Sequence, residues 1–328
     1  MPKNIKIYVS KVYEAPFNLA FEQFIFEECS EDEVVLYLWQ NEKTIVVGRH
    51  QNPYKECNLG LLQSDGINLV RRLSGGGAVY HDLGNLNFTF ISHSKNYDVN
   101  INYNIILDAL KKFGLNGEIS GRNDLTINGA KFSGNAFMSD DGFNCHHGTL
   151  LIDADMNALS RYLTPSNLKI SSKSIDSVKS RVTNLKDLNP DISVNALINE
   201  IISSFYIAYE GNGLPMYIDK KNVSLKIPEK ERNYTYWEWN YATTPGFDIS
   251  YEAKFSWGVF ELDLNVENSI ITQATINTDC ILKETFEKLE ANLIGKKFIK
   301  QELKELVNDS LTNPVIKEDI YLMLDSEK

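Results

Sequence analysis

The sequence contains few of the residues and patterns that several functional classes require. Four cysteines are spread over 328 residues without a Cys-x-x-Cys pair. This spacing excludes the usual zinc-ribbon pattern and a disulfide framework, and it is typical of a reducing compartment. No stretch reaches the roughly 18 consecutive apolar residues of a membrane span. Residues 1–16 alternate apolar and polar side chains, which predicts a strand rather than a signal peptide. We therefore expect a cytoplasmic protein without a membrane partner.

Positive charge is also scarce. The 33 Lys and Arg residues are outnumbered by 44 Asp and Glu residues, so the formal net charge is -11 and the pI is about 5.1. Nucleic-acid-binding proteins use an extended positive field, so this balance argues against a nucleic-acid partner. A local basic pocket for a small anion is still compatible with this negative net charge.

The hydrophobic residues, 43% of the chain, form strand-like and helix-like runs without a regular strand–helix–strand repeat. This grouping favours an α+β fold, with mixed, mostly antiparallel sheets flanked by helices, over a doubly wound fold. The expected strands are 4–10, 34–40, 44–48, 68–73, 77–81, 85–92, two short runs around 128–129, and 147–153. The expected helices are 17–27, one that opens at Asn52-Pro53, 103–114 and 194–209.

The composition changes after about residue 160. Residues 163–188 are polar and rich in Ser, Lys and Asn, which predicts a long ordered loop or short helices. Residues 241–247 combine Pro and Gly and form the most linker-like stretch. We place a domain boundary there, between a domain over residues 1–243 and a smaller α+β domain over 247–328. The smaller domain is predicted to hold a hairpin over 255–279 and three helices.

The segment RRLSGGGAVYHDLGN, from Arg71 to Asn85, places two arginines before three consecutive glycines. Such a run between strands often makes only a tight turn or bulge. Alternatively, residues without Cβ let main-chain N–H groups approach an anion, and Arg supplies a planar charged fork for phosphate or carboxylate. Strands on both sides distinguish it from the P-loop and dinucleotide motifs, which lead into a helix. Of the two arginines, we expect Arg72 to point inward.

A second motif, GRNDLTINGAKFSGNAF, spans residues 121–137. Asn128-Gly129 predicts a type I′ hairpin that carries Asp124 and Lys131 on neighbouring strands. A lysine at a reaction site polarises a carbonyl and neutralises a phosphate, and an aspartate holds Mg²⁺. The alternative for Lys131 is a solvated surface charge.

A third motif, GFNCHHGTLL, covers residues 142–151. Because successive strand residues point to opposite faces, only one of His146 and His147 is expected to face a site. For either histidine alone, a structural hydrogen bond is the simpler role.

In this order and spacing, the three motifs closely resemble those of lipoate–protein ligases of the A type. The resemblance covers residues 15–190, including KSIDSVKSRVTNL at 173–185, and the C-terminal part is similar to the family's accessory domain. It implies the biotin/lipoate ligase-like fold and a two-step reaction. Lipoate and ATP, with Mg²⁺, would form lipoyl-AMP, and the lipoyl group would then pass to a lysine of an acceptor protein. The implied acceptors are lipoyl domains of 2-oxoacid dehydrogenase E2 subunits and the glycine-cleavage H protein.

The resemblance also implies roles for individual residues. Lys131 would be catalytic, contacting the lipoyl carbonyl and the phosphate, and Asp124 would bind the metal. The residues implied in nucleotide binding are Arg72, Gly76, Gly77, Ala78, Val79, Tyr80, Asn85, Asn123, Asp124 and Lys131. Those implied in substrate binding are Arg71, Arg72, Ser74, Gly75, His81, Lys131, His147 and Gly148. Candidates for an apolar acyl slot, each equally compatible with plain core, are Leu19, Phe21, Trp39, Val46 and Val79.

Three other functions remain as alternatives. A lipoyl or octanoyl transferase of the same fold would use a cysteine and no ATP, and Cys145 stands beside His146. A biotin ligase shares the fold, but its GRGRxxR-like loop does not occur here. A non-catalytic lipoate carrier would not require Lys131 and Arg72.

Overall fold

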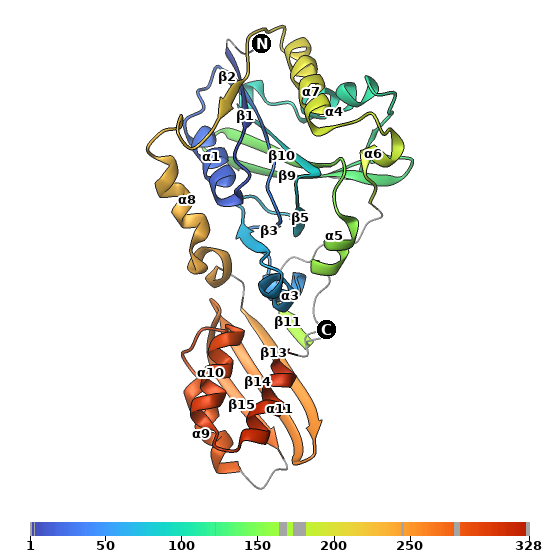
Figure 1. The fold of residues 1–328 in the computed structure, drawn as a ribbon. Helices are drawn as coiled ribbons and strands as arrows, with labels where there is room; N and C mark the ends of the chain where they lie inside the picture. The colour runs from blue at the N-terminus through green and yellow to red at the C-terminus, as the bar shows by residue number, and fades with distance from the viewer. Residues whose placement is uncertain are drawn as a thin grey trace. The chain divides into compact units, whose positions relative to one another are not determined.

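The chain forms two compact units, described here from a computed structural model (Figure 1). Unit 1 comprises Met1–Arg49, Asn68–Leu159 and Val178–Tyr236, and unit 2 comprises His50–Ile67, Ser160–Ser177 and Trp237–Lys328. The structure describes residues 2, 4–121, 123–163, 169–172, 182–243, 246–278 and 283–325. Each unit is made of three separate segments of the chain. The division into domains at residues 243–247 therefore stays a prediction.

Unit 1 is built on an eight-stranded sheet with the order β12-β1-β2-β6-β10-β9-β8-β7. The first three strands run parallel, and the remaining pairs are antiparallel. The strands are β1 (Asn4–Ser10), β2 (Glu33–Trp39), β6 (Asn85–His93), β7 (Glu118–Ser120), β8 (Asp124–Ile127), β9 (Ala130–Asp140), β10 (Phe143–Leu151) and β12 (Met216–Ile218). The expected α+β class with mixed, mostly antiparallel pairing is confirmed.

Helices cover both faces of this sheet because its central strands are apolar on both sides. All seven residues of β2 are buried. Leu36 belongs to the core formed with α4 (Val99–Lys111) and α7 (Val194–Ala208). Tyr37 points the other way and packs on Phe21 of α1 (Ala15–Glu27). The other helices of unit 1 are α6 (Leu185–Leu188), α8 (Ile227–Thr235) and the short 3-10 helix η1 (Ser94–Asn96), and α5 (Met156–Tyr162) runs across the boundary of the units.

A three-stranded sheet carries the glycine-rich segment. Its order is β4-β3-β5, from β4 (Asn68–Arg71), β3 (Thr44–Val47) and β5 (Val79–His81). Strands β4 and β5 are consecutive in the chain, yet both pair with β3 rather than with each other. The glycine loop, defined here as residues 72–78, therefore has to pass across the end of β3.

The predicted hairpin is confirmed at β8 and β9. Asn128 and Gly129 both have positive φ angles, 51° and 75°, as the two central residues of a type I′ turn require. The turn places Asp124 and Lys131 on neighbouring strands.

Unit 2 contains an antiparallel sheet with the order β11-β13-β14-β15. The predicted hairpin of β14 and β15 and all three C-terminal helices are present. Its elements are α2 (Pro53–Glu56), α3 (Leu59–Ser64), β11 (Lys169–Ser172), η2 (Glu238–Ala242), β13 (Phe247–Phe255), β14 (Gly258–Glu267), β15 (Ile270–Thr278), α9 (Lys283–Leu293), α10 (Lys300–Ser310) and α11 (Pro314–Asp325).

Some elements were missed from the sequence. Strand β13 was overlooked because it starts directly after the Pro-Gly linker signal, and β7, β12 and α8 lack a strong apolar period. Most of the polar stretch 163–188 and of the segment 173–185 lies outside the described residues. Across the described part of the chain, no helix combines the length and the apolar character needed to cross a membrane.

His146 belongs to the apolar core of unit 1. It is fully buried and packs on the rings of Phe137 and Tyr103. Asn102 Nδ2 donates to its Nδ1 over 3.4 Å, and its Nε2 lies 2.9 Å from Asn135 Oδ1, which fits the neutral ring with a proton on Nε2. Burial, with a smaller contribution from the charge of His147, lowers the pKa of His146 from 6.5 to about 3.

We predict that His146 makes the fold acid-sensitive. Between pH 6.5 and 3 the unfolded chain binds a proton at this histidine and the folded chain does not, so the free energy of unfolding falls as the pH falls. His146→Gln should reduce that slope by up to about 1.4 kcal/mol per pH unit at the acidic end, measured by urea unfolding between pH 7 and 5. The exposed His50→Gln is the matched control. Equal slopes for wild type and His146→Gln would contradict the assignment.

Candidate active site

The glycine loop is held from inside by Arg72. Its guanidinium Nη2 donates to the carbonyls of Gly75 and Gly77 at 2.7 and 2.8 Å, and its Nη1 donates to the Val46 carbonyl at 3.2 Å. Nε donates to Ser74 Oγ at 3.0 Å. The guanidinium of Arg72 thus faces the loop's own carbonyl groups, and its contact with a ligand stays a prediction.

Both arginines are buried in polar surroundings. Arg71 Nη1 donates to the carbonyls of Gly48 and Arg49. Burial lowers the pKa of Arg72 to about 10, and the charge of Glu22 counteracts part of this effect. Arg72 stays charged at neutral pH, since that value lies well above 7.

Gly76 gives the loop a shape that a side chain would oppose, because a Cβ there would lie 2.9 Å from Arg72 Nη2. Gly76 is exposed and has a φ of 89°, a backbone region that favours glycine. Its carbonyl oxygen lies only 2.1 Å from where a Cβ on Gly48 would be. Within the described residues, the main-chain N–H groups of Gly75, Gly76 and Gly77 donate no hydrogen bond. These three donors are therefore available to an anion.

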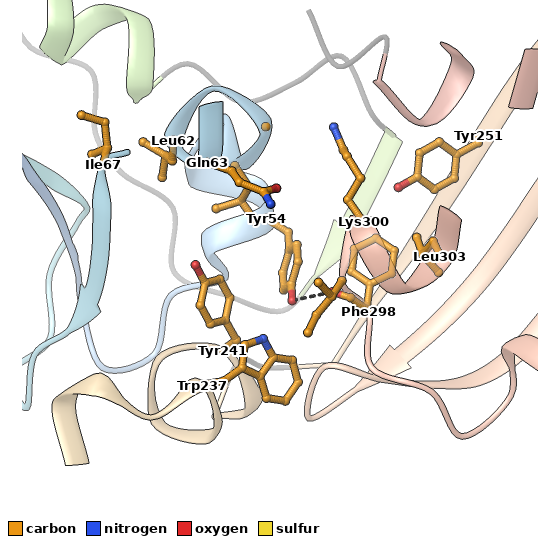
Figure 2. A pocket seen from close by; sticks show the side chains of 13 residues that line it. Tyr54, Leu62, Gln63, Ile67, Trp237, Tyr241, Tyr251, Phe298, Lys300 and Leu303 are labelled. Atoms are coloured by element: carbon orange, nitrogen blue, oxygen red, sulfur yellow. Dashed lines mark hydrogen bonds between the residues drawn. The ribbon is translucent and has the colours of Figure 1, made fainter. Parts of the chain in front are cut away.

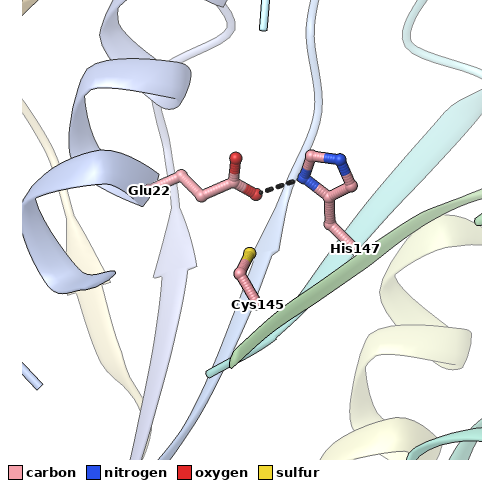
Figure 3. A group of neighbouring side chains, drawn as sticks. All are labelled: Glu22, Cys145 and His147. Atoms are coloured by element: carbon pink, nitrogen blue, oxygen red, sulfur yellow. Dashed lines mark hydrogen bonds and ion pairs between the residues drawn. The ribbon is translucent and has the colours of Figure 1, made fainter. Parts of the chain in front are cut away.

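A buried chain of polar contacts leads from the loop to α1. Ser74 Oγ lies 2.6 Å from His147 Nε2. On the other side of the ring, His147 Nδ1 lies 2.9 Å from Glu22 Oε1, the contact drawn in Figure 3. Thr89 Oγ1 donates to the same Glu22 oxygen at 2.6 Å, and Trp39 Nε1 donates to Thr89. Burial alone would raise the pKa of Glu22, but the charge and hydrogen bond of His147, with Thr89 and Arg72, hold it below its ordinary value.

Lys131 and Asp124 form an ion pair across the hairpin. Lys131 Nζ lies 2.8 Å from Asp124 Oδ1, and each side chain is about one quarter exposed. Gly134 leaves room for the lysine, because a Cβ there would lie 3.1 Å from Nζ. The lysine is therefore neither a freely solvated surface charge nor buried core.

The sheet brings the glycine loop and the hairpin together. A Cβ on Gly76 would lie 3.6 Å from Ala136 Cβ on β9, and Ala136 pairs with His147 on β10. Further along β9, Gly134 N donates to Thr149 Oγ1. Since alternate strand residues share a face, His147 and Thr149 lie on the same side of β10. The three motifs therefore meet on one face of the sheet.

Three buried polar atoms near these motifs have no hydrogen-bond partner within the described residues. They are His81 Nε2, Asn85 Oδ1 and Asn87 Nδ2. Asn41 Nδ2 donates to the other ring nitrogen of His81, and burial, with the charges of Arg72 and His147, lowers the pKa of His81 to about 3. Buried polar groups are normally satisfied, so unpaired ones in a group indicate a ligand or ordered water.

Two of the predicted site residues, Gly148 and Asn123, have structural contacts of their own. Gly148 lies on the opposite face of β10 from His147, where a Cβ would come within 2.5 Å of Phe88. A side chain at this position would therefore clash with the core, and the place of Gly148 among the substrate-binding residues stays a prediction. Asn123 uses its Nδ2 to bond the main chain of Asn135, so it joins β8 to β9.

The apolar candidates for the acyl slot fall into two groups, those buried in the core and those beside the polar residues of the site. Leu19, Phe21 and Val46 are buried, and Phe21 packs in a cluster of aromatic rings with Tyr37. Trp39 donates a hydrogen bond to Thr89, which in turn contacts Glu22. Val79 is half-buried next to the glycine loop.

One residue of this site, Glu22, was not predicted from the sequence, and another, Cys145, was predicted only for the transferase alternative. Glu22 is a buried carboxylate on the apolar face of α1, one helical turn after the buried Asn18. Cys145 was considered beside His146, but on a strand it shares a face with His147. Acceptor or ligand atoms of Glu22, Cys145 and His147 all lie within 4.8 Å of one another.

Unit 2 has a separate cavity of about 300 Å³ (Figure 2). Its lining is mostly apolar and aromatic, and Tyr54 donates from its hydroxyl to the Phe298 carbonyl at 2.9 Å. No predicted site residue lines it. The lining residues labelled in Figure 2 are Tyr54, Leu62, Gln63, Ile67, Trp237, Tyr241, Tyr251, Phe298, Lys300 and Leu303.

Known proteins resemble this chain over nearly its full length. Residues 14–206 match the lipoyl protein ligase A/B catalytic domain family, and residues 244–321 match the bacterial lipoate protein ligase C-terminus family. A lipoate-protein ligase A of Blochmanniella floridana is 40% identical over 297 residues, which cover 89% of this chain and 88% of that protein. One of Psychrobacter cryohalolentis is 39% identical over 308 residues, covering 92% and 91%. The structure of P. falciparum LipL1 in complex with lipoate has a TM-score of 0.66 at 31% identity, covering 99% and 100%.

We predict that the close approach of Gly48 to the loop is needed for stability. Gly48→Ala would force the Gly76 carbonyl aside and should lower the free energy of unfolding by about 1–3 kcal/mol. Gly75→Ala is the matched control, because a Cβ there meets nothing within 4 Å, and its effect should stay within about 0.5 kcal/mol. Denaturant unfolding of both variants checks this, and equal losses would refute the role of Gly48.

Proposed function

Since the chain belongs to the lipoyl protein ligase A/B family, we propose that it activates lipoate with ATP to lipoyl-AMP and transfers the lipoyl group to a lysine of an acceptor protein. One observation carries the proposal. The unpaired N–H groups of the glycine loop and the Lys131–Asp124 pair stand on one face of the sheet. This arrangement offers a phosphate both neutral donors and a positive charge.

The first step needs charge stabilisation more than proton transfer. Attack of the lipoate carboxylate on the α-phosphate places negative charge on the phosphate oxygens, and pyrophosphate leaves. Fixed main-chain donors in a partly closed site stabilise such charge strongly. We assign this task to the N–H groups of residues 75–77, together with Lys131.

Lys131 has a partner before substrates bind. Its ion pair with Asp124 is about one quarter exposed on each side, and partly exposed ion pairs contribute little stability, about 0–1 kcal/mol. Exchange of Asp124 for a phosphate or carbonyl oxygen therefore costs little. The lysine would then polarise the lipoyl carbonyl while the acceptor lysine attacks it and AMP leaves.

Asp124 is the side chain that would hold Mg²⁺. Within the described residues it belongs to no group of three metal-binding side chains. One carboxylate is still sufficient, because Mg²⁺ in nucleotide sites takes most of its ligands from phosphates and water. When bound, the ion would neutralise charge on the phosphates of ATP.

The acceptors we propose are lipoyl domains of 2-oxoacid dehydrogenases and the glycine-cleavage H protein, in the cytoplasm. Residues 1–243 would perform both half-reactions, and residues 247–328 would form the accessory domain. The polar atoms of Asn85 and His81 that have no partner are proposed to contact the bound adenylate.

We predict that Lys131→Ala lowers lipoate-dependent ATP–pyrophosphate exchange by at least about 100-fold, the usual cost of losing one contact to a developing charge. The matched control is Lys111→Ala, which removes an exposed lysine that also pairs with an aspartate. Circular dichroism verifies folding. Exchange at the wild-type rate in folded Lys131→Ala would refute the assignment.

Cys145 tests the transferase alternative. Its thiol is fully buried, and burial raises its pKa well above the ordinary value of 9.0. A thiol of this kind is a poor nucleophile. We predict that Cys145→Ser still modifies an acceptor domain in an ATP-dependent manner, measured by intact mass. Complete loss of transfer by a folded variant would favour a cysteine-dependent transferase.

A further inference from the structure

We propose that Glu22, Cys145 and His147 form a binding site for a thiophilic divalent cation such as Zn²⁺. The three side chains come from two elements: Glu22 projects from α1, and Cys145 and His147 project from one face of β10 (Figure 3). A carboxylate, a thiol and an imidazole are the three side-chain types that proteins use for zinc.

The separation of the ligand atoms suits one ion. Glu22 Oε, Cys145 Sγ and His147 Nδ1 lie within 4.8 Å of one another, and the first and last are 2.9 Å apart. Around tetrahedral zinc, with bonds of about 2.0–2.3 Å, ligand atoms are about 3.5 Å apart. Small side-chain rotations therefore bring all three to bonding distance.

Neighbouring residues would support two of the three ligands. With the metal on Nδ1 of His147, the ring proton moves to Nε2, where Ser74 Oγ stands 2.6 Å away to accept it. Thr89 Oγ1 donates to Glu22 at 2.6 Å. Metal-bound histidines and carboxylates usually have such partners, which orient the ligands.

Charge selects the class of ion. Glu22 and the Cys145 thiolate supply two negative charges, which a divalent cation cancels, and the thiol proton is released to solvent. A sulfur ligand favours Zn²⁺, or Co²⁺ as its spectroscopic substitute, over Mg²⁺ and Ca²⁺. The site is thus distinct in chemistry from the proposed Mg²⁺ position at Asp124.

The ion would also affect the glycine loop indirectly, through the side chains of His147 and Ser74. His147 contacts Ser74, and Ser74 accepts a hydrogen bond from Arg72. A metal on His147 would fix the tautomer of the ring and, through Ser74, the loop. If the proposed ligase function holds, we expect such an ion to inhibit by restricting the loop.

Titration of the full-length protein with Co²⁺ tests the site without using any activity. We expect one equivalent to give a near-ultraviolet thiolate-to-cobalt charge-transfer band, which Zn²⁺ abolishes by displacement. Cys145→Ser should lose the band and at least about 100-fold in affinity, since even supporting residues are worth about 10–100-fold. Cys57→Ser, which removes another buried thiol, is the matched control.

X-ray absorption of the stoichiometric Zn²⁺ complex of the wild-type protein provides a second measurement that needs no variant. One sulfur with nitrogen and oxygen neighbours supports the site. Coordination without sulfur, or a cobalt band that survives in folded Cys145→Ser, would overturn it. Both measurements omit lipoate and ATP, so their failure is distinguishable from failure of the proposed ligase function.

Discussion

The buried guanidinium of Arg72 is the constraint on which the site depends. A guanidinium only donates hydrogen bonds, and here it takes the carbonyl oxygens of Gly75 and Gly77 and the hydroxyl of Ser74. The negative ends of these peptide groups are therefore turned toward a positive charge. The N–H group of Gly76, on the other side of the peptide that carries the Gly75 carbonyl, is left for an incoming anion. The positive charge thus acts through the conformation of the loop as much as through direct attraction.

The second constraint is the two-residue period of β10. His147 and Thr149 lie on the site face, and His146 and Gly148 lie on the core face. One strand therefore separates a polar network from an aromatic core without any residue between them. This explains why adjacent histidines have different surroundings: one contacts Ser74 and Glu22, and the other packs among rings.

Much of this arrangement could be predicted from the sequence, and the failures have physical causes. Asn128-Gly129 fixed the hairpin because few residues adopt two successive positive φ angles. The strand period correctly separated His146 from His147. Glu22 could not be found, because no local pattern distinguishes a buried carboxylate in an apolar helix from an exposed one; its partners are distant in sequence. The inward turn of Arg72 was expected, but its contact with the loop carbonyls depends on the crossing of β3, which pairing in three dimensions decides.

The Lys131–Asp124 ion pair has a consequence for selectivity. In a chain with a net charge of -11, an unpaired lysine in an open site would attract any small anion. Because the lysine already has a counter-ion at 2.8 Å, an anion must displace a carboxylate to reach it. Binding then requires additional interactions at the same moment, such as those with the amides of the glycine loop. In the absence of substrate, Asp124 thus competes with any anion for Lys131. This competition favours a ligand that contacts both the glycine loop and Lys131 over one that offers negative charge alone.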